Sequence, residues 1–197
     1  MKKATHPKIA IVGRPNVGKS SLFNRIIGSR KAIVDSASGT TRDRLHADIK
    51  WKGKTFTIVD TGGFDPSINS GSNPEPAEGF EAAGKSGLAR LVLNQLDTAI
   101  KEADIIFFIT DVAAGVTHQD LELSERLRKT SKRIYLVVNK ADDRSSANKG
   151  MEFFELGLGD PYLVSANNGT GIEKLLDDAA RPMERALACD EIAAVKV

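Results

Sequence analysis

The sequence has one cysteine, few aromatic residues and no long hydrophobic run. A single cysteine, Cys189, excludes an internal disulfide and is typical of a reducing compartment. No apolar run approaches the length of a membrane-spanning helix, and no apolar signal core precedes the first predicted strand. The formal net charge of +2 is too small to indicate a nucleic-acid or membrane partner. We therefore expect a cytoplasmic globular protein with no membrane partner.

The most specific feature that is present is the segment Gly13–Ser20, which has the pattern G-x-x-x-x-G-K-S. It lies between an apolar run, Lys8–Val12, and a helical pattern over about Gly18–Ile27, which is the context of a phosphate-binding loop. Backbone N–H groups of such a loop point at phosphate oxygens. Lys19 can reach the β- and γ-phosphates, and the Ser20 hydroxyl can hold Mg²⁺. The residues predicted to bind phosphate are Asn16, Val17, Gly18, Lys19, Ser20 and Ser21.

Predicted strands and helices alternate along the chain. The strands are Lys8–Val12, Leu45–Trp51, Thr55–Val59, Ile105–Ile109, Ile134–Val138 and Tyr162–Val164. The helices lie near Gly18–Ile27, Ala89–Lys101, His118–Thr130, Ala147–Leu156 and Gly171–Leu187. The pair Lys52-Gly53 predicts a tight hairpin turn between the second and third strands. This order predicts an α/β fold: a mostly parallel six-stranded sheet with one antiparallel edge strand and helices on both faces.

One stretch differs in composition. Asp65–Gly87 is rich in proline, glycine, serine and asparagine, and it has too little apolar surface to offset the entropy of ordering. We expect a mobile loop of about twenty residues there, and loops of that length inside a domain are usually functional or disordered.

Two further motifs could complete a magnesium site. Asp60-Thr61-Gly62-Gly63 ends the third predicted strand, where Asp60 can hold Mg²⁺ through a water and Gly63 lets a backbone N–H approach a γ-phosphate. A hydroxyl within Ser38–Asp43, before the second strand, could complete the magnesium shell. Alone, the first motif also occurs as a common turn and the second as a polar loop.

The segment Asn139–Asp142 indicates the base. The Asp142 carboxylate can accept hydrogen bonds from the ring N–H and the amino group of guanine, and adenine has neither donor. The stem of Lys140 can lie over the base, and backbone N–H groups of Ser165–Asn167 can contact the guanine carbonyl. Taken singly, each segment could instead cap a helix. The residues predicted to bind guanine are Asn139, Lys140, Asp142, Ser165, Ala166 and Asn167.

Together these five motifs resemble translation-factor-class P-loop GTPases over nearly the whole chain. Gly13–Arg25, Thr41–Arg44 and Asp60–Gly63 resemble the Era-like branch. Phe154–Gly159 and Ser165–Gly171 look most like the first GTPase domain of the bacterial EngA/Der family, whose members carry two such domains. The resemblance implies a G domain that hydrolyses GTP to GDP and phosphate as a nucleotide switch. It also implies that the full-length protein acts in assembly of the large ribosomal subunit and contacts its rRNA, and that this fragment is a monomer.

The resemblance also assigns roles to single residues. Ser20, Thr41 and Asp60 would hold Mg²⁺, Ala32–Thr41 would form switch I, and residues 62–87 would form switch II. Phe64 stands where many GTPases place a water-orienting glutamine. Members with asparagine at the position of Asn16 use a bound K⁺, so the resemblance implies slow hydrolysis that K⁺ stimulates. The implied catalytic residues are Asn16, Lys19, Thr41 and Gly63.

The chain is shorter than that family implies. We expect residues 1–187 to form the GTPase domain and residues 188–197 to begin an interdomain linker of a truncated protein. A second hypothesis is a nucleotide-controlled interaction module with negligible turnover alone, which Phe64 and the missing domains favour. A third, a P-loop kinase that uses ATP, is disfavoured by Asn139–Asp142.

Overall fold

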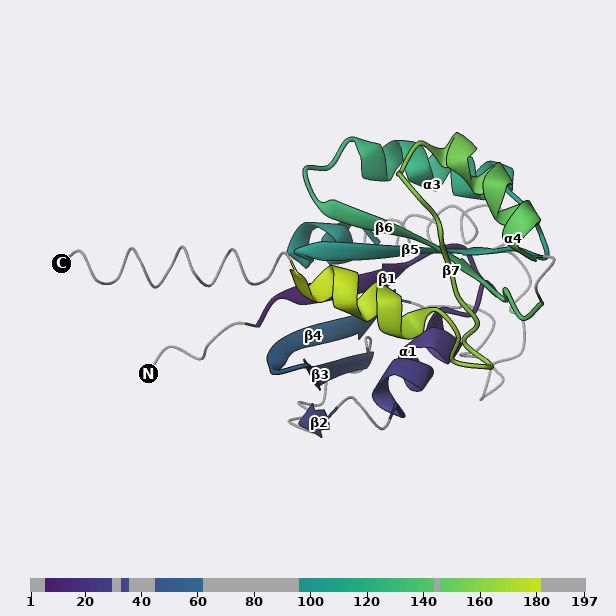
Figure 1. Cartoon of the computed structure of the whole chain (residues 1–197). Coiled ribbons are helices and arrows are strands. Elements are labelled where there is room, and N and C mark those ends of the chain that lie inside the picture. The colour runs from purple at the N-terminus through teal and green to yellow at the C-terminus, as the bar shows by residue number, and fades with distance from the viewer. Residues whose placement is uncertain (1–5, 30–32, 36–44, 62–95, 144–145, 182–197) are drawn as a thin grey trace, which may run out of the picture.

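A seven-stranded sheet organises the molecule, in the order β2-β3-β4-β1-β5-β6-β7 (Figure 1). The computed structural model describes residues 6–29, 33–35, 45–61, 96–143 and 146–181. The strands are β1 (Lys8–Val12), β2 (Ile33–Asp35), β3 (Leu45–Trp51), β4 (Lys54–Asp60), β5 (Ile105–Asp111), β6 (Arg133–Asn139) and β7 (Tyr162–Leu163). β1 pairs in parallel with β4 and β5, and β6 pairs in parallel with β5 and β7. Among the described strands, β3 runs in the direction opposite to the others, because it pairs antiparallel with both β2 and β4.

Helices cover both faces of this sheet. They are α1 (Lys19–Ile27), α3 (His118–Arg128), α4 (Ser146–Lys149), the 3-10 helix η2 (Gly150–Leu156) and helical residues 96–102 and 172–181. Ile9 and Ile11 of β1 pack in one apolar cluster with α1 and with helical residues 172–181. Ala10 and Val12 pack in a second cluster with residues 96–102, α3 and η2. Because both faces are covered, β1 and β5 consist almost entirely of apolar residues.

The α/β fold class predicted from the sequence is confirmed, with a correction to the sheet. The prediction of six strands missed β2, so the antiparallel strand is second from the edge and not at the edge. Three residues, Ile33–Asp35, are too few to show a strand pattern in sequence. The predicted helix Ala147–Leu156 is divided into α4 and η2, with the poor helix former Gly150 at the boundary. Part of the predicted helix Ala89–Lys101 lies outside the described residues.

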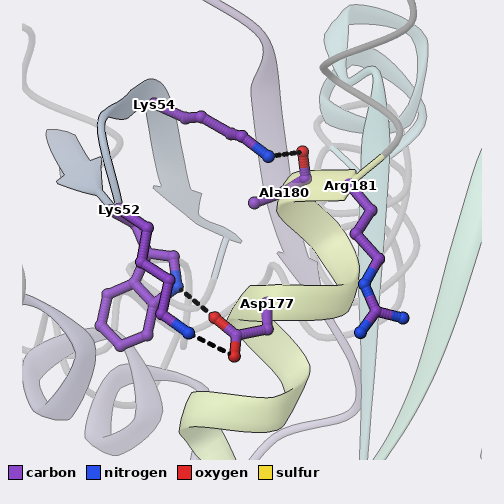
Figure 2. Close-up of a pocket in the computed structure, with 6 residues that line it drawn as sticks. Lys52, Lys54, Asp177, Ala180 and Arg181 are labelled. Carbon is purple, nitrogen blue, oxygen red and sulfur yellow. Dashed lines mark hydrogen bonds and ion pairs between the residues drawn. The ribbon is translucent and has the colours of Figure 1, made fainter.

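The hairpin between β3 and β4 is fastened to the helical residues 172–181 (Figure 2). Asp177 accepts hydrogen bonds from the buried Trp51 indole, at 2.8 Å, and from the Lys52 ammonium, at 2.6 Å. Lys54 Nζ donates to the carbonyl oxygen of Ala180 at 3.1 Å. These contacts surround a cavity of about 280 Å³ and fix the hairpin tip at the sheet end opposite to the P-loop.

In the part of the chain that the structure describes, no helix could span a bilayer.

Candidate nucleotide-binding site

The predicted motifs converge on one edge of the sheet. The P-loop follows β1, and the register of β1 with β4 sets Ile11 beside Asp60. On the other side of β1, the paired strands β5 and β6 end at Asp111 and Asn139, which are register partners. Carboxyl ends of parallel strands form the usual ligand edge of an open α/β sheet. The sequence-derived prediction that separate motifs meet at a sheet edge is therefore confirmed for the described ones.

The P-loop has a backbone that two glycines make possible. Gly18 has a φ of 94°, and a Cβ there would lie 2.3 Å from Asn139 Nδ2. A Cβ on Gly13 would lie 2.3 Å from the carbonyl oxygen of Ile109. No side chain of the described residues caps the first turn of α1, whose N–H groups lack intrahelical partners as at every helix start. Such an uncapped N-terminus is suited to a phosphate group.

The oxygen-bearing residues predicted to hold magnesium lie around this loop. Ser20 is exposed in the first turn of α1, and Asp60 is fully buried at the end of β4. The Thr61 hydroxyl donates to the carbonyl oxygen of Ile11 at 2.6 Å, which holds the end of β4 against β1. A hydroxyl and a carboxylate are the oxygen ligands that Mg²⁺ prefers, so the described residues fit the ion. Thr41, Gly63 and Phe64 lie outside the described residues. The same holds for predicted switch II (62–87) and for predicted switch I (Ala32–Thr41) except its residues Ile33–Asp35, which form β2.

Asn139 links the phosphate side of the site to the base side. Its side-chain Nδ2 donates to the carbonyl oxygen of Val17 at 2.9 Å, and its Oδ1 accepts from the Ala166 N–H at 3.0 Å. The residue is 2% exposed, so these bonds form away from water. Both polar atoms of Asn139 thus hold protein backbone, which gives this residue a positioning role.

Asp142 and Ser165 come together as predicted from the sequence. The Ser165 hydroxyl donates to Asp142 Oδ1, and the Asn168 amide donates to the same oxygen at 3.4 Å. The Ser165 hydroxyl also accepts from the Asn168 N–H at 2.9 Å. The Ala141 N–H donates to the carbonyl oxygen of Val164, at 3.0 Å, and joins the two loops through backbone. Ser165 and Asn168 thus hold the exposed Asp142 carboxylate at the edge of the candidate site.

Lys140 pairs with a carboxylate that the sequence reasoning did not single out. Its Nζ lies 2.7 Å from Asp111 Oδ2, and its φ of 64° is in the left-handed region. Burial alone would raise the pKa of Asp111, but hydrogen bonds from Lys140 and from the Ala113 N–H outweigh it and lower that pKa. Asp111 therefore stays ionised and holds the Lys140 ammonium beside the loop. The feature of the sequence that could have identified Asp111 is its position, as an acidic residue at the end of a buried strand.

Arg25 of α1 is a second residue that the sequence reasoning missed. Its guanidinium donates to the carbonyl oxygens of Ala166, at 2.6 Å, and of Asn167. The contact spans 141 positions of the sequence, and no local pattern predicts it. A cavity of about 340 Å³ lies between α1 and this turn, lined by Ser21, Asn24, Arg25, Gly28, Ala166 and Asn167.

Comparisons with known proteins agree with this geometry. A family model described as 50S ribosome-binding GTPase matches residues 8–140. The GTPase Der of Thermomicrobium roseum is 44% identical over 181 residues, which cover 91% of this chain and 37% of that relative. The chain thus spans less than half the length of this curated relative.

Solved structures with the same fold include two of Era. The Era variant of Aquifex aeolicus bound to GDP and aluminium fluoride is 24% identical with a TM-score of 0.64, covering 88% of this chain and 56% of that one. Another Era structure, in complex with MgGDPNP and a segment of 16S ribosomal RNA, is 24% identical with a TM-score of 0.63. It covers 90% of this chain and 57% of that one, and at such identity the likeness shows the fold alone.

Proposed function

The chain belongs to the family of 50S ribosome-binding GTPases, and on that premise we propose that it binds GTP and hydrolyses it to GDP and phosphate. The observation that carries this proposal is the position of Asn139, which bonds to the P-loop at Val17 and to the loop after β7 at Ala166. One side chain thereby links the proposed phosphate-binding loop to the proposed base-binding loop.

The phosphate side of the proposal uses Lys19, Ser20 and Asp60. The Lys19 ammonium lies in the P-loop, where it can neutralise charge on the β- and γ-phosphates. Ser20 and Asp60 would hold Mg²⁺, which supplies charge neutralisation when bound. Thr41 and the backbone N–H of Gly63 complete the proposed site. Since no side chain here is a strong base or nucleophile, catalysis would come from positioning and charge.

The base side uses Asp142. Its carboxylate accepts two hydrogen bonds from guanine, whereas adenine would set its unprotonated ring nitrogen against the carboxylate and lacks the 2-amino group of guanine. Lys140 covers the base with its methylene stem. Of the three N–H groups of Ser165–Asn167, that of Asn167 faces the guanine carbonyl in this proposal, because those of Ser165 and Ala166 already donate to the Thr170 carbonyl oxygen and to Asn139 Oδ1. Asn139, also predicted from the sequence to bind guanine, positions both loops.

We further propose that hydrolysis is slow and that K⁺ accelerates it through Asn16. The Asn16 side chain is exposed on the P-loop, with a φ of 64°, and its amide oxygen is a ligand type that suits K⁺. Turnover measured in KCl should exceed turnover in NaCl, and the difference should disappear in Asn16→Ala. Equal rates in the two salts would contradict the K⁺ proposal.

In the longer protein, the domain would act as a cytoplasmic nucleotide switch in assembly of the large ribosomal subunit. The family description and the Der relatives support this role. The other candidate is an interaction module that binds nucleotide with negligible turnover. Single-turnover hydrolysis distinguishes the two, because a rate equal to that of free GTP favours the module.

Calorimetry with GDP, with and without Mg²⁺, tests the proposed function most directly. We expect tight GDP binding and no competition from ATP. Asp142→Ala should weaken GDP binding by about a hundredfold, because two hydrogen bonds to a carboxylate are lost. Asn168→Ala, which removes only the long contact to Asp142, is the matched control. Preference of the wild-type protein for ATP would refute the proposal.

A further inference from the structure

Arg14, the second residue of the P-loop, contacts Asp120 through its side chain and Lys19 through its backbone carbonyl. Its side-chain Nε lies 3.3 Å from Asp120 Oδ2 on α3, across 106 positions of the sequence. The exposed fractions of the two side chains are 16% and 0%. Solvent screens such a pair far less than a surface pair. The P-loop, which follows β1, is therefore joined by an ion pair to the first turn of α3, the helix that follows β5.

Asp120 is itself held in a fixed place. It is the third residue of α3, and its Oδ2 accepts from the N–H of Thr117, at 3.1 Å, and from the Thr117 hydroxyl, at 2.7 Å. The Asp120 N–H donates back to the Thr117 hydroxyl at 3.3 Å, which completes a capping box. A carboxylate in the first turn of a helix is also stabilised by the helix dipole. The anchor for Arg14 thus belongs to a rigid helix start.

The other contact of Arg14 is through its backbone. Its carbonyl oxygen accepts a hydrogen bond from Lys19 Nζ at 2.7 Å. The anchored side chain and this carbonyl belong to one residue, so the Arg14–Asp120 pair limits where the carbonyl, and hence the Lys19 ammonium, can lie. We propose that Arg14 is a positioning residue, which sets the Lys19 ammonium toward the phosphates by tying the P-loop to α3. This inference rests on the proposed function, in which Lys19 contacts the phosphates.

The pair is poorly arranged for stability alone. Arg14 Nη2 and Asp120 Oδ1 are both buried, and neither has a hydrogen-bond partner among the residues that the structure describes. A buried ion pair with unsatisfied atoms contributes little net stability compared with apolar packing. One of these atoms is a donor and the other an acceptor, yet the two do not bond to each other in this arrangement. Because the pair adds little net stability, positioning of the P-loop explains it better than stabilisation of the fold does.

A double-mutant cycle tests the inference on the whole chain. The dissociation constant of a non-hydrolysable GTP analogue is measured for the wild-type protein, Arg14→Ala, Lys19→Ala and the double variant. We expect Arg14→Ala to weaken binding about tenfold in the wild-type background and less than about twofold in Lys19→Ala, because coupled residues are not additive. A general structural defect would weaken binding equally in both backgrounds, and that result would overturn the inference.

Two further variants complete the experiment. Arg14→Lys keeps a cation that can reach Asp120, and it should lose less affinity than Arg14→Ala; it replaces that variant if Arg14→Ala does not fold. Arg126→Ala is the matched control on α3, because the contact of the Arg126 side chain that the described residues show is an exposed one, 4.0 Å from Asp97. It should change binding in neither background. Absence of any guanine-nucleotide binding by the wild-type protein would instead refute the proposed function.

Discussion

Replacement of Asn139 by alanine should both unfold the domain at lower temperature and weaken nucleotide binding. Asn139 is 2% exposed, and its amide bonds the carbonyl oxygen of Val17, at 2.9 Å, and the N–H of Ala166, at 3.0 Å. Alanine would remove both bonds and leave a buried acceptor and a buried donor without partners. The two loops that they join lie on either side of the proposed nucleotide.

The size of the effect follows from these two groups. Each buried polar group that loses its partner costs about 1–3 kcal/mol, so the variant should lose about 3 kcal/mol of folding free energy. In a domain of this size, that corresponds to a fall in melting temperature of about 6–12 °C. Such a loss is a substantial part of the stability of about 5–15 kcal/mol that is usual for a domain. GDP should also stabilise the variant less than it stabilises the wild-type protein.

Thermal unfolding with and without GDP measures both effects. Asn168→Ala is the control, because it removes an exposed amide that makes a long contact of 3.4 Å with Asp142. It should change the free energy of unfolding by less than about 0.5 kcal/mol. Asn139→Asp keeps the acceptor for the Ala166 N–H and loses the donor to Val17, so it separates the two bonds. The reasoning fails if Asn139→Ala melts no lower than Asn168→Ala.

Three other expectations follow from the structure. Gly13→Ala should abolish nucleotide binding in calorimetry, because its Cβ would lie 2.3 Å from the Ile109 carbonyl oxygen; unchanged GDP affinity would contradict this. Hydrogen bonds from the Lys52 ammonium and the Trp51 indole lower the pKa of Asp177, so its contribution to stability is present above its ordinary pKa of 3.8 and is lost as pH falls through the lower folded value. Urea midpoints of the wild-type protein and Asp177→Asn should therefore differ at neutral pH and converge in acid, and a constant difference would refute this. Burial, followed by the hydrogen bond to Asp178, raises the pKa of Tyr162 to about 12. The stability that protonated Tyr162 contributes is therefore present below its ordinary pKa of 10.0 and is lost as pH rises from 10 toward 12. Tyrosinate absorbance should show late ionisation that Asp178→Asn shifts to lower pH.

The sequence alone determined the features that depend on neighbouring residues. The P-loop was predictable because its glycines, Lys19 and Ser20 act within eight positions of one another. The hairpin turn at Lys52-Gly53 was predictable for the same reason, and its φ angles of 47° and 82° confirm it. Continuous apolar runs likewise indicated β1, β5 and β6, since a strand covered on both faces leaves few polar positions. The roles of Thr41 and Gly63 stay predictions.

Only the tertiary structure decided which distant residues hold these motifs in place. The Arg14–Asp120 pair joins residues 106 positions apart, and the bond from Asn139 to Val17 spans 122. The ion pair of Lys140 with Asp111 depends on the register of β5 with β6. Such contacts follow from the order of strands in the sheet, which local spacing does not encode. The motifs therefore identify the chemistry, and packing around the sheet determines the geometry in which it can occur.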